Sequence, residues 1–320
     1  MNIGCCFTGG LKRVLRSPAL IIFIYATSVV IVLPLTVGVR EAIKGSVGSS
    51  LVQENLRKGF DLDWYGEFVS QERGLGETFG PQVTGFLPTL KNIEKLLDGR
   101  ILTNEFSLSL AGILFLAAWA FWGGGIISCY AQPETPTVRS SLFADAGKYF
   151  LPFVRLVILS VLLYLALYRW LASPLFRLID RLTNDTPAEA PEMICSGLVY
   201  LLMAILLAVF SMAMDYAKIA MVTEQRRSAV LAFLRGLGFV LSNKLKTVGL
   251  YLCLVVVGIF LFALYGLLAP GPSQSGNFSL IAAFMFGQVF LIARLLLKLW
   301  FLGSQTVLFQ SVIKPDSAQS

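Results

Sequence analysis

Three ionisable residues lie inside long apolar segments of the sequence, where a charge is costly and therefore informative. They are Arg155, Asp215 and Arg294. A charged side chain at the centre of a bilayer costs about 3 kcal/mol by insertion measurements, so such residues are default candidates for a functional site. With the nearby Lys218 and Gln288, they form the candidate intramembrane polar cluster of this chain.

Two interpretations of this cluster are open. Arginines and a carboxylate that face one space would hold an anionic headgroup or gate a path across the membrane. Alternatively, Asp215 forms a structural ion pair with one of the arginines or with Lys218, which lies three residues further along the same helix. The remaining arginines would then extend their charges to the lipid interface.

The sequence offers little for catalysis, and we expect a protein that is not an enzyme. It contains no histidine and no H-E-x-x-H, G-x-S-x-G or Walker A motif. Asp61 and Asp63 are spaced as in metal-binding D-x-D sequences, but a solvated turn ahead of a helix is the preferred interpretation. The five cysteines have no C-x-x-C spacing, so we expect neither a metal site nor a cofactor.

The composition shows which kind of scaffold must position these residues. Of the 320 residues, 56% are hydrophobic and 14% are charged, and the mean hydropathy is +0.73. A soluble domain carries roughly 25% charged residues, mostly on its surface. This chain has too few charges to cover a water-facing globule, so its solvent is lipid.

Six apolar segments are long enough to cross a bilayer, which takes about 20 helical residues. They cover residues 19–39, 108–130, 150–171, 197 to about 222, 248–269 and 280 to about 302. The first is too long for a signal peptide and no A-x-A site follows it, so we interpret it as a retained anchor. We therefore predict an all-α integral membrane protein with six transmembrane helices.

The distribution of charge predicts the orientation of these helices. If both termini are cytoplasmic, the inner segments carry 15 basic and five acidic residues, a net charge of +10, whereas the outer segments carry a net −3. Lys and Arg concentrate in the cytoplasmic flanks of membrane helices. The total charge of +7 is thus an orientation signal, and we expect no nucleic-acid partner.

The chain divides into three parts. Residues 1–39 hold an interfacial helix and the first span, residues 40–107 form an outer helical insertion, and residues 108–320 hold the other five spans. The insertion is too short to bury an independent core without disulfides. Its candidate surface for contact with a partner or the membrane consists of Trp64, Tyr65 and Phe68. Alternatively, these three rings close a small core of the insertion itself.

A short pattern precedes each odd-numbered span. A phenylalanine is followed three residues later by a small residue, at Phe7 and Gly10, at Phe143 and Ala146, and at Phe233 and Gly236. The surrounding stretches are apolar on one side and basic on the other, as in helices that lie in the headgroup layer. The pattern predicts three units, each an interfacial helix followed by a membrane hairpin, with chance similarity as the alternative.

Basic residues near the inner ends of the spans are candidate contacts for anionic lipid headgroups on the cytoplasmic side. They are Lys12, Arg13, Arg16, Arg226, Arg227, Arg235, Lys244 and Lys246.

Two stretches carry a resemblance to a known group of proteins. Residues 214–222, Met-Asp-Tyr-Ala-Lys-Ile-Ala-Met-Val, with Arg-Arg-Ser-Ala at 226–229, resemble uncharacterised bacterial multi-pass membrane proteins, and so do 293–294 and 297–299 in the last span. Looser relatives include the membrane domain attached to some glycerophosphodiester phosphodiesterases. The resemblance implies an all-helical bacterial inner-membrane protein with no agreed activity, and the phosphodiesterase activity is not carried over.

Together these observations favour a non-catalytic component of a bacterial cytoplasmic membrane. We expect an accessory subunit or scaffold that contacts anionic lipid through its basic inner face and has a membrane protein or a second copy as its partner. The alternative is a permease or lipid-handling transporter with a cavity between helical hairpins. Its signature would be a water-accessible cavity lined by Arg155, Asp215, Arg294 and Gln288.

Overall fold

A computed structural model describes residues 2–48, 55, 61–71, 86–98, 106–132, 138–183, 189–269 and 277–313. These residues form helices and no strand. The helices long and apolar enough to cross a membrane are α2 (Pro18–Ser46), α6 (Phe106–Ala131), α7 (Val138–Leu167), α9 (Glu189–Thr223), α11 (Lys244–Leu268) and α12 (Asn277–Ile313). The prediction of an all-α membrane protein with six spans is confirmed.

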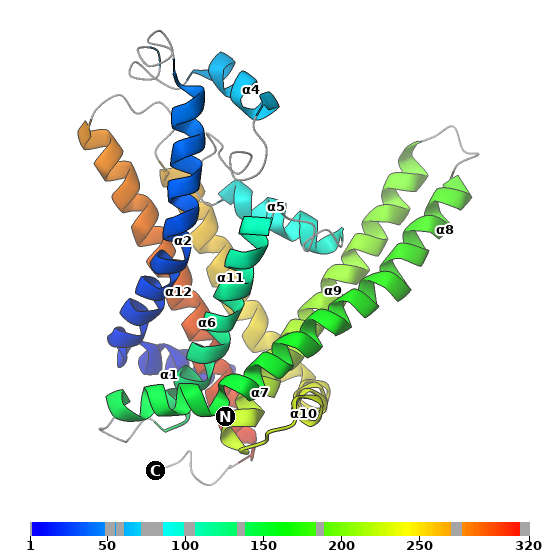
Figure 1. Ribbon diagram of the computed structural model, residues 1–320. Helices are drawn as coiled ribbons and strands as arrows, with labels where there is room; N and C mark the ends of the chain where they lie inside the picture. The colour runs from blue at the N-terminus through cyan, green and yellow to red at the C-terminus, as the bar shows by residue number, and fades with distance from the viewer. Residues whose placement is uncertain are drawn as a thin grey trace.

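Shorter helices lie at the two ends of the bundle. Near the N-terminus, α1 (Ile3–Leu15) and α10 (Ala229–Ser242) lie across one end, which we call the α1 end (Figure 1). Toward the opposite end, which we call the α4 end, lie α4 (Leu62–Gln71) and α5 (Phe86–Leu97). Asp61 caps α4, because its carboxylate accepts the backbone N–H groups of Asp63 and Trp64 at 3.1 Å each. This agrees with the interpretation of the D-x-D sequence as a turn ahead of a helix.

The second predicted interfacial helix is not a separate element. Residues 141–150 are the first part of α7, which changes direction after this part and contains Pro152 (Figure 1). Proline is a common cause of such a bend because it removes one backbone hydrogen bond. A π-helical turn, Tyr168–Ala172, joins α7 to α8 (Ser173–Thr183). The hairpin of α8 and the start of α9 leans away from the other helices (Figure 1).

The three predicted units pack through one repeated aromatic contact. The ring of Phe7 in α1 lies 4.5 Å from that of Trp300 in α12. The Phe143 ring at the start of α7 lies 5.6 Å from the Trp122 ring in α6. In the third unit, Phe233 of α10 and Phe210 of α9 have ring centroids 6.0 Å apart.

The small residue of the pattern allows the backbones to approach. A Cβ atom added to Gly10 would lie 2.5 Å from the backbone nitrogen of Ser304, and one added to Gly236 would lie 2.3 Å from the carbonyl oxygen of Ala213. In the second unit, a Cβ atom on Gly125 of α6 would lie 3.4 Å from that of Ala146. The receiving helices repeat the spacing, with small residues three positions after their aromatic residues, at Gly125, Ala213 and Gly303.

The repeated contacts close the three units into a ring. The start of α7 packs on α6 of the first unit, α10 packs on α9 of the second, and α1 packs on α12 of the third. The receiving helices α6, α9 and α12 also contact one another, and we call them the inner helices. The internal repeat is therefore a structural feature, and the ring axis runs among the inner helices.

Candidate functional site

A cavity of about 480 Å³ lies among the inner helices and the adjoining α7 and α11, and we call it the polar cavity. Its polar lining consists of Ser211, Asp215, Lys218, Tyr251, Arg294 and Lys298. The rest of the wall is apolar and rich in aromatic rings, including Phe115, Phe153 and Phe301. The cavity therefore brings charged side chains from two helices, α9 and α12, to one space inside the membrane-spanning bundle.

The repeated contact places this cavity on the ring axis. Each inner helix contributes to the cavity wall the residue that stands two positions before its small residue. These residues are Gly123, Ser211 and Phe301. The residues two positions after the small residues are Ile127, Asp215 and Gln305. Ile127 and Asp215 line the cavity, and the Gln305 amide Nε2 donates to Asp215 Oδ2 at 3.4 Å. Equivalent positions of the three units therefore meet around one space.

Asp215 is paired within its own helix. Lys218 Nζ lies 2.9 Å from Asp215 Oδ1, which is the i,i+3 pair that the sequence left open as one alternative. Gln305 supplies the second hydrogen bond to the carboxylate. The carboxylate thus forms its ion pair with Lys218 and not with a cation of α12.

Arg294 and Lys298 contact aromatic rings instead of carboxylates. Lys298 Nζ lies 3.4 Å from the centroid of the Trp119 ring, and Arg294 Cζ lies 5.3 Å from that of Phe262. In the part of the chain that the structure describes, neither side chain forms an ion pair. Cation–π contacts contribute about 0.5–2 kcal/mol, less than the cost of about 3 kcal/mol for a charge at membrane depth. Two positive charges in the cavity therefore remain to be balanced by another group.

The structure divides the predicted polar cluster. Asp215, Lys218 and Arg294 line the polar cavity together. Gln288 lies elsewhere, where its Oε1 accepts the hydroxyl of Tyr25 in α2 at 2.6 Å. Arg155 is exposed on α7 and lines neither this cavity nor the groove described next.

Sequence reasoning missed Lys298 as a member of the cluster. It lies near the predicted inner end of the last span, which made it a flanking residue rather than an intramembrane one. Its spacing of four residues from Arg294 was the available signal, because residues i and i+4 share one face of a helix.

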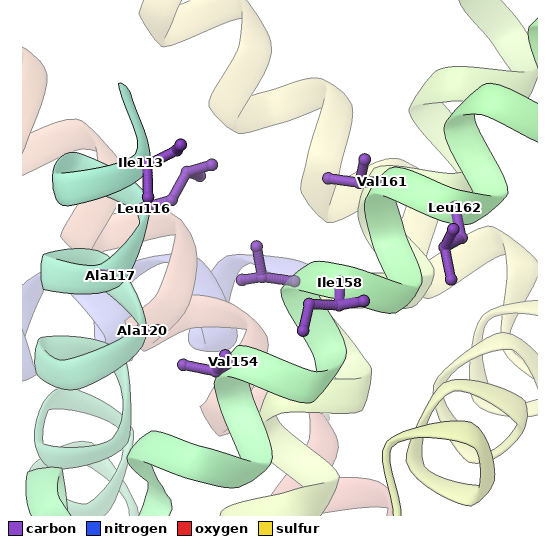
Figure 2. A pocket seen from close by; sticks show the side chains of 9 residues that line it. Ile113, Leu116, Ala117, Ala120, Val154, Ile158, Val161 and Leu162 are labelled. Carbon is purple, nitrogen blue, oxygen red and sulfur yellow. The ribbon is translucent and has the colours of Figure 1, made fainter. Parts of the chain in front are cut away.

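An apolar groove of about 320 Å³ continues the polar cavity between α6 and α7 (Figure 2). All nine residues that line it are apolar, and we call it the apolar groove. Ile113 and Leu116 of α6 point across the gap toward Val154 and Val161 of α7 (Figure 2). Three residues line both the groove and the polar cavity, Leu116, Ala120 and Val157. A charged space and a hydrocarbon-like groove therefore adjoin and share part of one wall.

Seven of the eight candidate headgroup contacts are exposed, and Arg13 is the exception. Its guanidinium is half-buried between α1, α6 and α12, where Nη1 donates to the carbonyl oxygen of Tyr130 and, at 3.0 Å, to Gln310 Oε1. Burial lowers the pKa of the Arg13 guanidinium. Its Nη1 atom thus joins three helices, and a contact of this residue with a lipid headgroup stays a prediction.

The predicted outer contact surface is also corrected. Trp64 and Phe68 are 6% and 1% exposed, their rings lie 5.3 Å apart, and Trp64 Nε1 donates to Ser46 Oγ at the end of α2. Tyr65 is half-buried. The two buried rings close a small core within the insertion, which was the alternative left open by the sequence.

In the described part of the chain, no three Cys, Asp or Glu residues lie close enough to hold a metal ion. No protein-family model, curated protein or solved structure matches the chain. The function must therefore be inferred from the geometry of the polar cavity and the apolar groove.

Proposed function

We propose that this chain is a non-catalytic, lipid-handling protein of a bacterial cytoplasmic membrane, which binds an anionic amphiphile inside the bilayer. The anionic headgroup occupies the polar cavity and an acyl chain lies in the apolar groove. The observation that carries the proposal is that the cavity with the two cations of α12 shares part of its wall with a wholly apolar groove.

The charges of the polar cavity favour an anion. Its lining holds three cations and one carboxylate, and Lys218 pairs with that carboxylate. Arg294 and Lys298 remain to bind a phosphate or carboxylate, with the guanidinium offering a planar fork of donors and the ammonium a compact point charge. A charge-assisted hydrogen bond contributes about 1.5–3 kcal/mol, enough to offset the cost of placing each cation in the membrane.

The dimensions of the site favour a lipid over a small ion. The polar cavity of about 480 Å³ lies within the range of about 300–1,000 Å³ that is typical of sites for organic ligands. An inorganic ion would leave most of this volume unused and would not need the apolar groove. A ligand with a headgroup and a hydrocarbon chain fills both.

The position of the cations along α12 supports a headgroup drawn below the membrane surface. We place the α1 end on the cytoplasmic side, because basic residues concentrate there. If α1 lies in the headgroup layer, Ser304 marks that depth through its contact with Gly10. Arg294 precedes Ser304 by ten residues, so it lies about 15 Å further along the helix, near the middle of the bilayer.

If the protein is instead an accessory subunit or scaffold, we expect no lipid bound in the polar cavity and the apolar groove. The cations of the cavity would then be structural, and lipids would contact the outer surface of the bundle without preference for the groove. One experiment separates the two functions.

We expect an anionic phospholipid with a photoactivatable group midway along one acyl chain to crosslink to residues 113–120 and 154–162, the two walls of the groove. Crosslinked peptides are identified by mass spectrometry. Val256 and Ile259 of α11, which are 63% and 64% exposed, provide the comparison surface. Crosslinks of equal yield on α11 and on the groove would favour the scaffold.

A further inference from the structure

A second cavity of about 480 Å³ lies at the α1 end of the same helices, and we call it the end cavity. Its polar lining comes from α6, α7, α9 and α12 and from the residues that directly follow α6 and α9, and includes Gln132, Asp145, Lys148, Glu224 and Gln310. It lies where the bundle meets the headgroup layer in the proposed orientation, and hydrated groups can occupy it.

The end cavity and the polar cavity follow one another along four shared helices. On α6 the two linings meet at the consecutive residues Ile127 and Ser128. On α9 three residues separate the linings, because one ends at Lys218 and the other begins at Val222, an interval of four positions. The interval on α7, from Phe153 to Tyr149, is the same, and on α12 it runs from 302 to 309. Because one helical turn rises about 5.4 Å, a single turn of α7 and α9 separates the two spaces.

We call residues 219–221 of α9 and 303–308 of α12, which separate the two cavities, the closed layer; Tyr149 of α7 borders it in the lining of the end cavity. The residues 219–221 and 304–306 are buried, each at most 2% exposed. Tyr149 closes the layer toward the end cavity, because its hydroxyl donates to the carbonyl oxygen of Val222 at a long 3.4 Å. A Cβ atom on Gly124 would lie 2.7 Å from the Cβ atom of Tyr149, so α6 fixes the position of this tyrosine.

Gln305 gives the closed layer a polar centre. It is 2% exposed, its amide nitrogen donates to Asp215 in the polar cavity, and its Oε1 atom has no hydrogen-bond partner among the described residues. Buried polar atoms normally have a partner, and one without a partner costs free energy. The bond to Asp215 uses only the amide nitrogen, so the acceptor left over on the same side chain points to a hydrated group that reaches it.

The charges at the end cavity nearly cancel. Its lining holds the carboxylates of Asp145 and Glu224 and the ammonium group of Lys148. Outside the lining, Arg226 and Arg235 pair with Glu224 at 2.5 Å and 3.0 Å, which brings the local sum to one positive charge. Both sides of the closed layer are therefore compatible with the same negatively charged headgroup.

We propose that the two cavities are successive positions on one route along the ring axis, and that the hydrated anionic headgroup moves between them when the closed layer opens beside Gln305. The route rests on the proposed function, because the group that moves along it is the headgroup that occupies the polar cavity. The hydrogen bond of the Tyr149 hydroxyl holds the layer closed. Gln305 is the group that the headgroup or its water contacts during passage.

The route is tested by the labelling of introduced cysteines in sealed vesicles, in a background without the five native ones. Thr223→Cys reports on the end cavity and Ser211→Cys on the polar cavity, with Leu297→Cys as a second reporter there. A membrane-impermeant thiol reagent is added from the side on which Thr223→Cys reacts, which identifies the α1 end. Tyr149→Phe removes the hydroxyl that holds the layer closed. Its matched control is Tyr164→Phe on the same helix, whose hydroxyl bonds the backbone of Leu96 at 2.6 Å away from the layer.

We expect both polar-cavity reporters to react more slowly than Thr223→Cys, and Tyr149→Phe to accelerate them about fivefold, the population shift for one lost hydrogen bond. Tyr164→Phe leaves the rates unchanged, and Gln305→Leu slows them. Equal rates in the two tyrosine variants, or no reaction of either reporter from this side in any variant, overturns the route.

The two proposals fail separately. Retention of an anionic phospholipid by the same variants is measured alongside the labelling rates. Lipid retained without any labelling of the polar cavity from the α1 side overturns the route and leaves the proposed function standing. Accelerated labelling in Tyr149→Phe without retained lipid supports a route for water and overturns the proposal that a lipid headgroup moves along it.

Discussion

The double substitution Arg294→Gln and Lys298→Gln is expected to abolish the preference of this protein for an anionic over a zwitterionic lipid. Each cation contributes a charge-assisted hydrogen bond of about 1.5–3 kcal/mol, and about 1.4 kcal/mol corresponds to a tenfold change in affinity. The double variant should therefore bind at least about a hundredfold more weakly. The measurement is equilibrium binding of a fluorescent anionic phospholipid to the purified protein in mild detergent.

The matched control removes two charges outside the cavity. Arg177→Gln and Arg181→Gln alter exposed residues of α8 that line neither cavity. This variant should bind within about twofold of the unaltered protein, because exposed charges contribute little. An equal loss in the control would mean that net charge, rather than the site, governs binding. An unaltered affinity in the cavity variant would contradict the assignment of the headgroup to Arg294 and Lys298.

The second large effect is expected from Gly10→Ala, which places a methyl group inside the contact between α1 and α12. The new Cβ atom would lie 2.1 Å from Ser304 Oγ and 2.5 Å from the Ser304 backbone nitrogen. Because backbone atoms cannot rotate away, α1 must shift and weaken the hydrogen bond of 2.8 Å from Trp300 Nε1 to the carbonyl oxygen of Phe7. We expect a loss of about 3 kcal/mol, seen as a thermal unfolding midpoint lower by about 5–10 °C.

Gly9→Ala is the internal comparison for this variant. A Cβ atom at this neighbouring position would lie 3.6 Å from Val307 Cγ1, an ordinary contact. Alanine also favours a helix over glycine by about 1 kcal/mol, so the midpoint should stay or rise. The third unit offers the same comparison, with Gly236→Ala destabilising and Gly238→Ala, which meets nothing within 4 Å, tolerated. Similar losses at both members of a pair would contradict the ring of repeated contacts.

The sequence predicted the spans well because hydropathy responds to the solvent, and the solvent here is lipid. Hydropathy says less where protein replaces lipid as the surroundings. The apolar window of the last span ends near 302, whereas the helix α12 continues to Ile313. Ser304, Gln305 and Thr306 lower the hydropathy of this part, yet all three are buried in the closed layer. Polar residues that pack within the protein ended the apolar window without ending the helix.

The candidate site was predicted in part because sequence gives the depth of a residue and not the direction in which it faces. Arg155 has the depth of a site residue but is exposed on α7. Gln288 has it too but bonds Tyr25 in another helix. Lys298 and Gln305 belong to the site although Lys298 lies near the inner end of the last apolar segment and Gln305 lies beyond it. The repeat of phenylalanine and small residues carried more spatial information, since it identified the three contacts that place the cavity on the ring axis.

The most direct test of the account is native mass spectrometry of the protein released from bilayers that contain equal amounts of an anionic and a zwitterionic phospholipid with identical acyl chains. We expect the protein to retain the anionic lipid selectively at low activation energy, and we expect Arg294→Gln with Lys298→Gln to abolish this retention. Retention of both lipids in equal amounts, or the same selective retention by the double variant, would contradict a headgroup site in the polar cavity.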